Sequence, residues 1–429
     1  MTDLAFQDTD EPIEEHTSPR APVAAVDVRP VPRISIQAFC DSAELAKVIE
    51  GAAADRRMAR AHVKVHSGGI VAAAEFYQGA ATPNLIIVES KLAPARLDAE
   101  LDRLSEVCDA GTKVVVIGHV NDVELYRGLT HRGVSEYLVA PVDLMSVIRA
   151  VSDLYVDRAT QPLGRTIAFV GAKGGVGSSM VAHNVAWAIA RAFENDVVVA
   201  DLDLAFGTAG LDFNQDPTQG IAEAVSAPDR LDDNFLDRLL AKCSDHLSLL
   251  AAPATLDRTY DFDETAFEQV IDVAQNGVPA VILDVPHSWN AWVKKTLLSV
   301  DEVVLTVEPD LANLRNAKNM VDLLRQGRTN DVPARLVINK SGLAKRPEIK
   351  VEDFSTALNL KPLAIIPFDA HLFGTAANNG QMIAETDPKS PIAGAFDMIG
   401  RTVSNRTEIK RQKQSMITSL FKKRGKKGA

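Results

Sequence analysis

The sequence predicts an α/β protein built from two doubly wound domains. Short apolar runs alternate with helix-like segments over residues 34–152, and the same alternation returns over residues 166–400. Strands that alternate with helices in this way form a parallel sheet covered by helices on both faces. Between the two stretches, residues 153–165 are polar and contain proline and glycine, which is typical of a linker.

The first predicted domain, residues 34–152, contains a small set of strand candidates. Amphipathic helices fit between them, for example over residues 42–54 and 97–108. The preceding residues 1–33 are rich in Pro, Asp, Glu and Thr, so we expect an acidic, disordered N-terminal segment. The strand candidates are residues 34–39, 62–65, 85–88, 113–117 and 136–139.

The second predicted domain, residues 166–400, begins with a strand, a glycine-rich loop and a helix. The apolar run 166–170 leads into the loop 171–179, and a helix-like run covers residues 181–192. Bare glycine backbone lets successive N–H groups point at phosphate oxygens, and the start of the helix adds its positive end. A strand, a loop of this kind and a helix in this order indicate a P-loop.

Composition excludes several other classes of protein. The three cysteines, Cys40, Cys108 and Cys243, form no CxxC pair, which argues against a disulfide framework and against a zinc site. The nine histidines lack metal-site spacing, and we expect His287 to be a loop residue. No run of 18 apolar residues predicts a membrane span, and the N-terminus lacks the apolar core of a signal peptide. We therefore expect a cytoplasmic protein.

The loop reads Gly-Ala-Lys-Gly-Gly-Val-Gly-Ser-Ser and resembles the deviant Walker A loop of the MinD/ParA family. The family pattern is K-G-G-x-G-K-[ST], and this chain departs from it only at Ser178, where the family has lysine. The resemblance implies that ATP and Mg²⁺ bind here, with Ser179 as a Mg²⁺ ligand and slow hydrolysis because of Ser178. It also implies that Lys173, with no partner expected in its own chain, reaches across an ATP-dependent homodimer. The residues that would cradle the phosphates are Gly174, Gly175, Val176, Gly177, Ser178 and Ser179.

Carboxylates follow two further apolar runs of the second domain. Residues 197–200 end in Asp201-Leu202-Asp203, and residues 280–283 end in Asp284. The carboxyl ends of parallel strands form the edge at which such sheets bind ligands. By resemblance to the family's acidic motifs, Asp203 orients the attacking water, and Asp201 and Asp284 belong to the Mg²⁺ shell, a task that suits carboxylates.

Two later segments resemble the part of the family that holds the base. The run 336–338 ends in Asn339, which matches the asparagine that reads the adenine edge. Residues 365–369 read Ile-Ile-Pro-Phe-Asp and resemble the "IP-x-D" segment that closes over the adenine. The resemblance therefore assigns Asn339, Pro367 and Asp369 to nucleotide binding.

The first domain resembles a response-regulator receiver that has lost its phosphorylation chemistry. The third strand ends in Glu89 where a receiver has its acceptor Asp, and Gly118 replaces the Ser or Thr expected after the fourth strand. Ala140 stands where the lysine before Pro141 is expected, while Asp41, near the end of the first strand, matches a residue of the receiver's acidic pocket. We therefore expect a protein-interaction module on a receiver-like, flavodoxin-like fold, with an unrelated small α/β domain as the alternative.

The pairing of a degenerate receiver with a MinD/ParA-type domain resembles the CpaE/TadZ group. These are localisation ATPases of tight-adherence (Flp-type) pilus assembly, so the resemblance implies partners in the pilus secretion machinery and a site at the cell pole or inner membrane. Three alternatives stay open. They are a ParA/MinD-type partitioning or cell-division ATPase, a non-hydrolysing ATP-gated scaffold, and a response regulator with an enzymatic output.

The end of the chain differs from the body in charge. The net charge is −11, yet residues 401–429 contain ten Lys or Arg and one acid, Glu408. Apolar residues within 409–421 fall on one face of a helix, and basic residues follow, which is typical of a helix that lies on an anionic membrane. A solvated basic tail is the alternative. Nucleic-acid binding is disfavoured, because the body is acidic and Phe421 is the tail's one aromatic.

Overall fold

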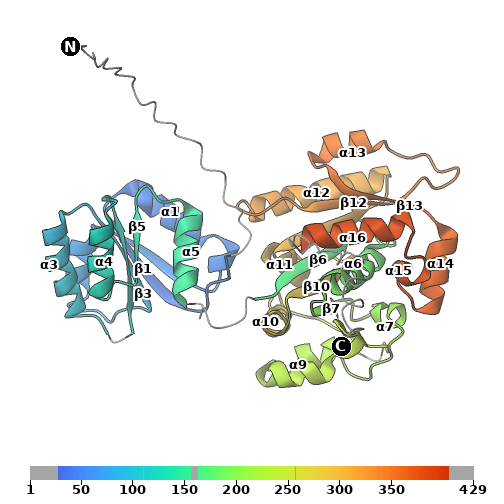
Figure 1. The fold of residues 1–429 in the computed structure, drawn as a ribbon, viewed down its shortest axis with the longest axis horizontal. Helices are drawn as coiled ribbons and strands as arrows, with labels where there is room; N and C mark the ends of the chain where they lie inside the picture. Colours follow the sequence, from blue (N-terminus) through green and yellow to red (C-terminus); the bar gives the residue numbers. More distant parts are fainter. Residues whose placement is uncertain (1–27, 110, 156–162, 257, 405–429) are drawn as a thin grey trace, which may run out of the picture.

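The computed structural model shows two α/β bodies joined by a connecting segment (Figure 1). It describes residues 28–109, 111–155, 163–256 and 258–404. The predicted disordered segment up to residue 27 and the predicted amphipathic tail from residue 405 on lie outside the described residues. None of the helices in the described ranges combines the length and apolar character needed to cross a bilayer.

The first domain is a five-stranded parallel sheet in the order β2-β1-β3-β4-β5. This is the flavodoxin-like order of a doubly wound sheet, so the fold predicted for this domain is confirmed. The strands are β1 (Ser35–Cys40), β2 (His62–Ser67), β3 (Leu85–Ser90), β4 (Lys113–Gly118) and β5 (Glu136–Val139). All five predicted strands are present.

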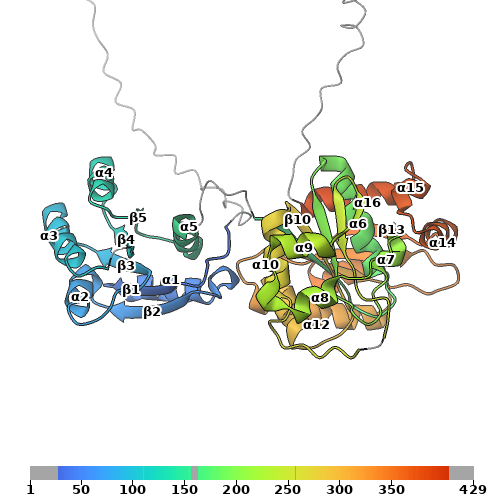
Figure 2. The ribbon, with the colours of Figure 1, turned by 90° about the horizontal axis from the view of Figure 1, so that it is seen from below.

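Helices cover both faces of this sheet (Figure 2). One apolar core forms with α1 and α5, and a second forms with α2, α3 and α4. The helices are α1 (Ala43–Ala53), the 3₁₀ turn η1 (Arg56–Met58), α2 (Gly69–Phe76), α3 (Pro94–Ser105), α4 (Val123–His131) and α5 (Leu144–Tyr155).

Both edges of the first domain differ from the predicted boundaries. Val31 falls in the segment predicted to be disordered, but its side chain is fully buried and its N–H donates to the carbonyl of Arg57 at 2.7 Å. At the other end, α5 continues to Tyr155, inside the predicted linker 153–165. The local amino-acid composition does not reveal that the domain extends at either end, because each extension is stabilised by packing against residues distant in sequence.

The second domain is an eight-stranded sheet in the order β13-β12-β11-β6-β10-β7-β9-β8. Every pairing is parallel except that of β8 with β9. The strands are β6 (Arg165–Gly171), β7 (Val197–Asp201), β8 (Ala241–Ser244), β9 (Leu247–Leu250), β10 (Ala280–Val285), β11 (Glu302–Val307), β12 (Arg335–Ser341) and β13 (Pro362–Pro367).

Two helical layers bury this sheet, which explains its nearly continuous apolar strands. One layer consists of α6 (Ser178–Phe193), α7 (Ala209–Asp212), α14 (Ala370–Asn379), α15 (Ile383–Thr386) and α16 (Pro391–Val403). The other consists of α8 (Ile221–Ser226), the turn η2 (Pro228–Arg230), α9 (Asp233–Leu239), α10 (Glu268–Gly277), α11 (Ala291–Ser299), α12 (Leu311–Gly327) and α13 (Val351–Leu358).

A buried group of charged side chains connects the two domains, and we call it the interdomain ion cluster. Arg56 of η1 donates its Nε to Asp331 at 2.8 Å and its NH2 to Asp301 at 3.0 Å. Arg57 and Arg328 also contact the Asp331 carboxylate. The cluster comprises Asp55, Arg56, Arg57, Asp301, Arg328 and Asp331. Because Asp301 and Asp331 precede β11 and β12, the first domain docks at the amino-terminal ends of these strands.

Candidate nucleotide-binding site

The glycine-rich loop connects the end of β6 to the start of α6 in the middle of the sheet. Gly175 and Gly177 have φ angles of 82° and 85°, in the left-handed region that favours glycine. A Cβ atom at Gly177 would also lie 2.7 Å from the Nδ2 atom of Asn339. These glycines are therefore required by the shape of the loop.

Side chains from the segment after β10 and from α12 hold the loop in this shape. His287 places its Nδ1 atom 3.0 Å from the carbonyl oxygen of Gly171. Asn316 donates to the carbonyl of Ala172 at 2.9 Å. Sequence patterns did not indicate either contact, because each joins positions more than 100 residues apart. His287, predicted to be an ordinary loop residue, thus supports the loop.

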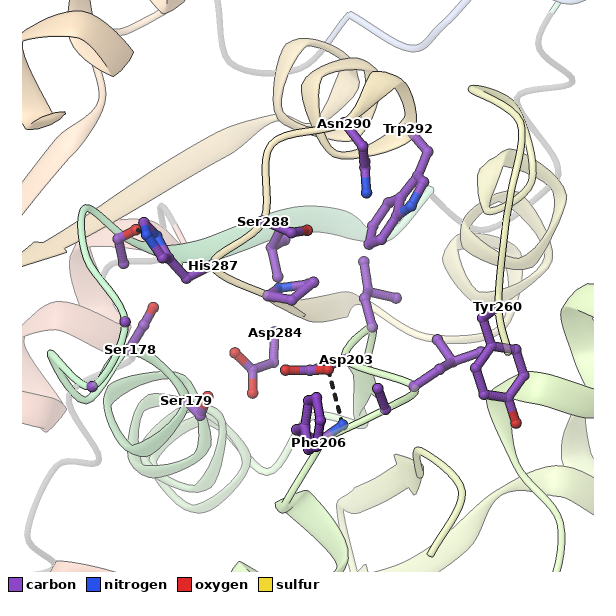
Figure 3. Close-up of a pocket in the computed structure, with 18 of the residues that line it drawn as sticks. Ser178, Ser179, Asp203, Phe206, Tyr260, Asp284, His287, Ser288, Asn290 and Trp292 are labelled. Carbon is purple, nitrogen blue, oxygen red and sulfur yellow. Dashed lines mark hydrogen bonds between the residues drawn. The ribbon is translucent and has the colours of Figure 1, made fainter. Parts of the chain in front are cut away.

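The loop lines a cavity of about 960 Å³. Figure 3 shows Ser178, Ser179, Asp203 and Asp284 around this cavity. The Oγ atom of Ser178 is buried and has no hydrogen-bond partner among the described residues. The loop residues predicted to cradle phosphates all line the cavity, together with Lys173. Open backbone amides, a helix start and facing carboxylates suit a nucleotide phosphate chain with a divalent cation.

Asp201, which the sequence assigns to the Mg²⁺ shell, is held by backbone N–H groups. It is absent from the cavity wall, and its two carboxylate oxygens accept the N–H groups of Asp203 and Ala209, each at 3.1 Å. Burial, and then the nearby charge of Asp284, raise the pKa of Asp201 well above the ordinary Asp value. Asp201 therefore anchors the loop after β7, and Asp203 and Asp284 are the carboxylates that face the cavity.

A buried histidine, His183 of α6, lies beside these carboxylates. Its Nδ1 atom is 2.7 Å from Oδ2 of Asp212, and its Nε2 atom is 3.3 Å from Oδ2 of Asp284. Burial alone would lower the pKa of His183, but the two carboxylates raise it to about 10. The two carboxylates thus favour the protonated imidazole, whose charge offsets the negative charge of the buried carboxylates.

Asn339, which the sequence assigns to the base, lies in the wall of a second cavity. It is fully buried, its Nδ2 donates to the carbonyl of Val176 at 2.8 Å, and its Oδ1 has no partner among the described residues. This second cavity has a volume of about 200 Å³. An unpaired carbonyl oxygen beside an apolar cavity suits the amino group of a purine. The cavity is lined by Gly177, Met180, Asn184, Asp212, Asn339, Lys340, Phe368, Phe373, Ala376, Ala377, Gln381, Met382 and Ile383.

Pro367 and Asp369 flank this cavity without lining it. Pro367 ends β13, and the Asp369 carboxylate caps α14 by accepting the N–H of Leu372 at 2.9 Å. The residue between them, Phe368, lines the cavity. The assignment of Pro367 and Asp369 to nucleotide binding therefore stays a prediction, and Phe368 is the residue of this segment that lines the cavity. The aromatic residue between Pro367 and Asp369 is the feature of the sequence that could have indicated Phe368 as a lining residue.

The first domain has a pocket of another kind at the carboxyl end of its sheet. Glu89 is buried, and its carboxylate accepts the N–H of Ser42 at 2.8 Å, the Ser42 hydroxyl at 2.9 Å and a hydrogen bond with His119 at 3.1 Å. Burial works to raise the pKa of Glu89, but these donors lower it. A fixed carboxylate thus occupies the position expected of a receiver's acceptor Asp.

Comparison with known proteins shows relatives of the second domain. The sequence profile of a family described as an AAA domain matches residues 164–332. The septum site-determining protein MinD of Helicobacter pylori is 26% identical over 240 residues, which cover 54% of this chain and 87% of MinD. A ParA family ATPase from Chlorobium tepidum TLS is similar in structure, with a TM-score of 0.51 at 24% identity over 55% of this chain and 98% of its own.

Higher identity is found with a pilus assembly protein. The structure of the pilus assembly protein CpaE from Caulobacter crescentus CB15 is 53% identical and covers 30% of this chain and 98% of its own, with a TM-score of 0.30. The sequence identity carries the relationship. This chain therefore belongs to the CpaE type of the MinD/ParA family of P-loop ATPases.

Proposed function

We propose that this chain is an ATP-binding, slowly hydrolysing localisation factor for a Flp/Tad-type pilus secretion machine, at the cell pole or inner membrane. The observation that carries the proposal is the 53% identity with a pilus assembly protein. The loop, the cavity and the unpaired Oδ1 of Asn339 support the nucleotide part.

In this proposal each group of residues in the site has a separate role. The backbone of residues 174–179 and the start of α6 hold the phosphates, Ser179 and Asp284 hold Mg²⁺, and Asn339 and Phe368 hold the base. Bound Mg²⁺ supplies charge neutralisation of the phosphates. Asp203 faces the same cavity and orients water, while Asp201 fixes the loop that carries Asp203. Lys173 acts on the nucleotide of a second copy.

Exposed apolar side chains at the cavity support the homodimer. Phe206 and Leu256 line the cavity but are 74% and 66% exposed, and Leu311, next to Asp310, is 73% exposed. Apolar side chains left in water around a ligand mouth are typical of a protein–protein interface. We propose that a second copy covers them when ATP is bound. The pilus secretion machinery is then recruited by this ATP-bound form.

Two experiments test the proposal. Calorimetry with the full-length chain should give micromolar binding of Mg-ATP, and turnover should be well below that of an ordinary P-loop ATPase. In cells, deletion of the gene should abolish pili and disperse pilus secretion proteins, and the wild-type gene should restore both. A gene that encodes Lys173→Ala should not restore them. A gene that encodes His246→Gln, a change far from the cavity, should restore both. No binding at millimolar Mg-ATP would refute the nucleotide part.

A partitioning or cell-division ATPase is the second candidate, supported by the 26% identity with MinD. It predicts that deletion misplaces septa or chromosomes and leaves pili intact. A non-hydrolysing scaffold is the third candidate, supported by Ser178 in place of lysine. It predicts that ATP binds without any measurable release of phosphate.

A further inference from the structure

His183 occupies a position between the two cavities of the site. Its side chain is fully buried in α6, four residues after Ser179 and therefore on the same face of the helix. One of its carboxylate neighbours, Asp284, lines the cavity formed by the loop. The other, Asp212, lies in α7 and lines the cavity that contains Asn339. His183 thus touches the wall of each cavity from behind.

His183 is the side chain that lies within ion-pair distance of the Asp284 carboxylate. Within the described part of the chain, no other side chain forms a hydrogen bond or ion pair with this carboxylate. The Asp212 carboxylate fixes the ring in turn, because Nδ1 donates to it at 2.7 Å. The Nε2 atom lies 3.3 Å from Oδ2 of Asp284, an ion-pair contact that falls outside hydrogen-bond geometry. An arrangement of carboxylate, imidazole and carboxylate that orients a metal-facing oxygen is a familiar device of metal sites.

We propose that His183 is a positioning residue for the nucleotide-bound cation: it holds the Asp284 carboxylate in place and ties it to Asp212 in the wall of the base cavity. The inference rests on the proposed binding of ATP and Mg²⁺. Loss of the imidazole leaves Asp284 beside the buried Asp201 without its orienting partner. Cation-dependent binding then suffers, whereas contacts of the loop backbone with the phosphates stay.

The test compares full-length variants by calorimetry with ADP, first without metal and then at increasing Mg²⁺. His183→Gln should need about tenfold more Mg²⁺, with a metal-free affinity within about twofold of the wild type. His183→Leu, with no polar atom, should need more Mg²⁺ than His183→Gln. Asp212→Asn should fall between the wild type and His183→Gln, because it keeps an acceptor for Nδ1 but removes the charge.

A matched control exists at the other end of the sheet. His246 places Nδ1 2.9 Å from Oδ1 of Asp196, as His183 does with Asp212, but this pair is exposed and distant from the cavity. His246→Gln should require the wild-type concentration of Mg²⁺. Thermal unfolding of each variant reports how much stability is lost apart from binding.

The outcomes separate the alternatives. If His183→Gln and Asp212→Asn need no more Mg²⁺ than the wild type, the positioning role is refuted. If metal-free and Mg²⁺-dependent affinities fall together, His183 only packs the core, and the role is again refuted. If His183→Leu does not fold, the other two variants still decide. If the wild type itself binds neither ADP nor Mg-ADP, the proposed function fails instead.

Discussion

The Nζ atom of Lys173 lies 3.4 Å from Oδ2 of Asp310 in the same chain. We had expected Lys173 to have no partner within its chain, and this expectation is wrong. Both side chains are partly exposed, at 48% and 30%, so the pair contributes at most about 1 kcal/mol. A contact this weak holds the lysine near the cavity but lets it leave when a better partner arrives.

The first prediction concerns this pair. Lys173→Ala should weaken ATP-dependent dimerisation, because the lysine can no longer reach the partner's nucleotide. Asp310→Asn should strengthen dimerisation by up to about fivefold, since it frees Lys173 while asparagine still caps α12. Analytical ultracentrifugation with and without ATP measures both. If dimers form equally well without ATP and in the alanine variant, Lys173 does not act on the partner's nucleotide. Deletion of residues 1–155 would then show whether the first domain forms the dimer.

Ser178→Lys should raise both affinity and turnover. A lysine at this position adds a charge-assisted contact to the phosphates, worth roughly 1.5–3 kcal/mol, which corresponds to about tenfold or more in affinity. It also balances charge that develops during hydrolysis. Phosphate release and calorimetry check the two effects. Ser178→Ala is the control, because it removes only a hydroxyl that has no partner in the structure. Unchanged turnover in Ser178→Lys would show that Ser178 does not set the rate.

Glu89 should make the first domain sensitive to acid. Its pKa is lowered in the folded chain from the ordinary value of 4.5, so its contribution to stability is present above pH 4.5 and is lost as the pH falls further. Glu89→Gln should lower the free energy of unfolding at neutral pH by about 1.5–3 kcal/mol, because hydrogen bonds to a buried charge are lost. Denaturant titration of both proteins should show this difference shrinking below pH 4.5. Glu100→Gln, which alters a pair with the exposed Arg103 on the surface of α3, should behave as the wild type.

The interdomain ion cluster should be sensitive to the loss of one carboxylate. Asp331→Ala removes the carboxylate that the buried Arg57 and Arg328 share, while Arg57 keeps its pair with Asp55, so we expect a cost at the lower end of the range for a broken buried pair, about 3 kcal/mol. Asp272→Ala breaks a second contact between the domains, the exposed pair with Arg60, and should cost under about 1 kcal/mol. Calorimetric unfolding measures both. Equal costs would mean that burial of the cluster contributes nothing.

The basic tail, which from residue 405 on lies outside the described residues, should bind anionic membranes. Each Lys or Arg near such a surface contributes about 1 kcal/mol, and residues 401–429 contain ten. The full-length protein should float with anionic vesicles and not with neutral ones, and a chain that ends at Arg406 should float with neither. Equal flotation of the two chains would favour the solvated tail.

Sequence patterns predicted the architecture because the strands are buried on both faces. Such strands are continuous apolar runs, and β6, β7 and β10 were found in this way. The antiparallel edge formed by β8 and β9 was missed. β8 is short and carries Lys242 and Cys243 in place of an apolar run.

The supports of the candidate site could not be predicted from local pattern. In the sequence, His183 is one more residue of a largely apolar helix. Its contacts are with Asp212 of α7 and Asp284 of β10, which lie far along the chain. Asp201 matches the acidic motif, yet its carboxylate oxygens accept hydrogen bonds from backbone N–H groups of the following loop. Motifs locate the loop and the strand ends, whereas long-range packing decides which side chains face the cavity.

The place where the first domain docks determines how two copies would be arranged. The interdomain ion cluster lies at the amino-terminal ends of β11 and β12, while the glycine-rich loop follows the carboxyl end of β6 in the same parallel sheet. A pair joined across the nucleotide mouths would therefore carry its two first domains outward. ATP would then raise the number of first domains in one assembly from one to two. Binding to an array of partners would gain avidity without any new contact in the first domain.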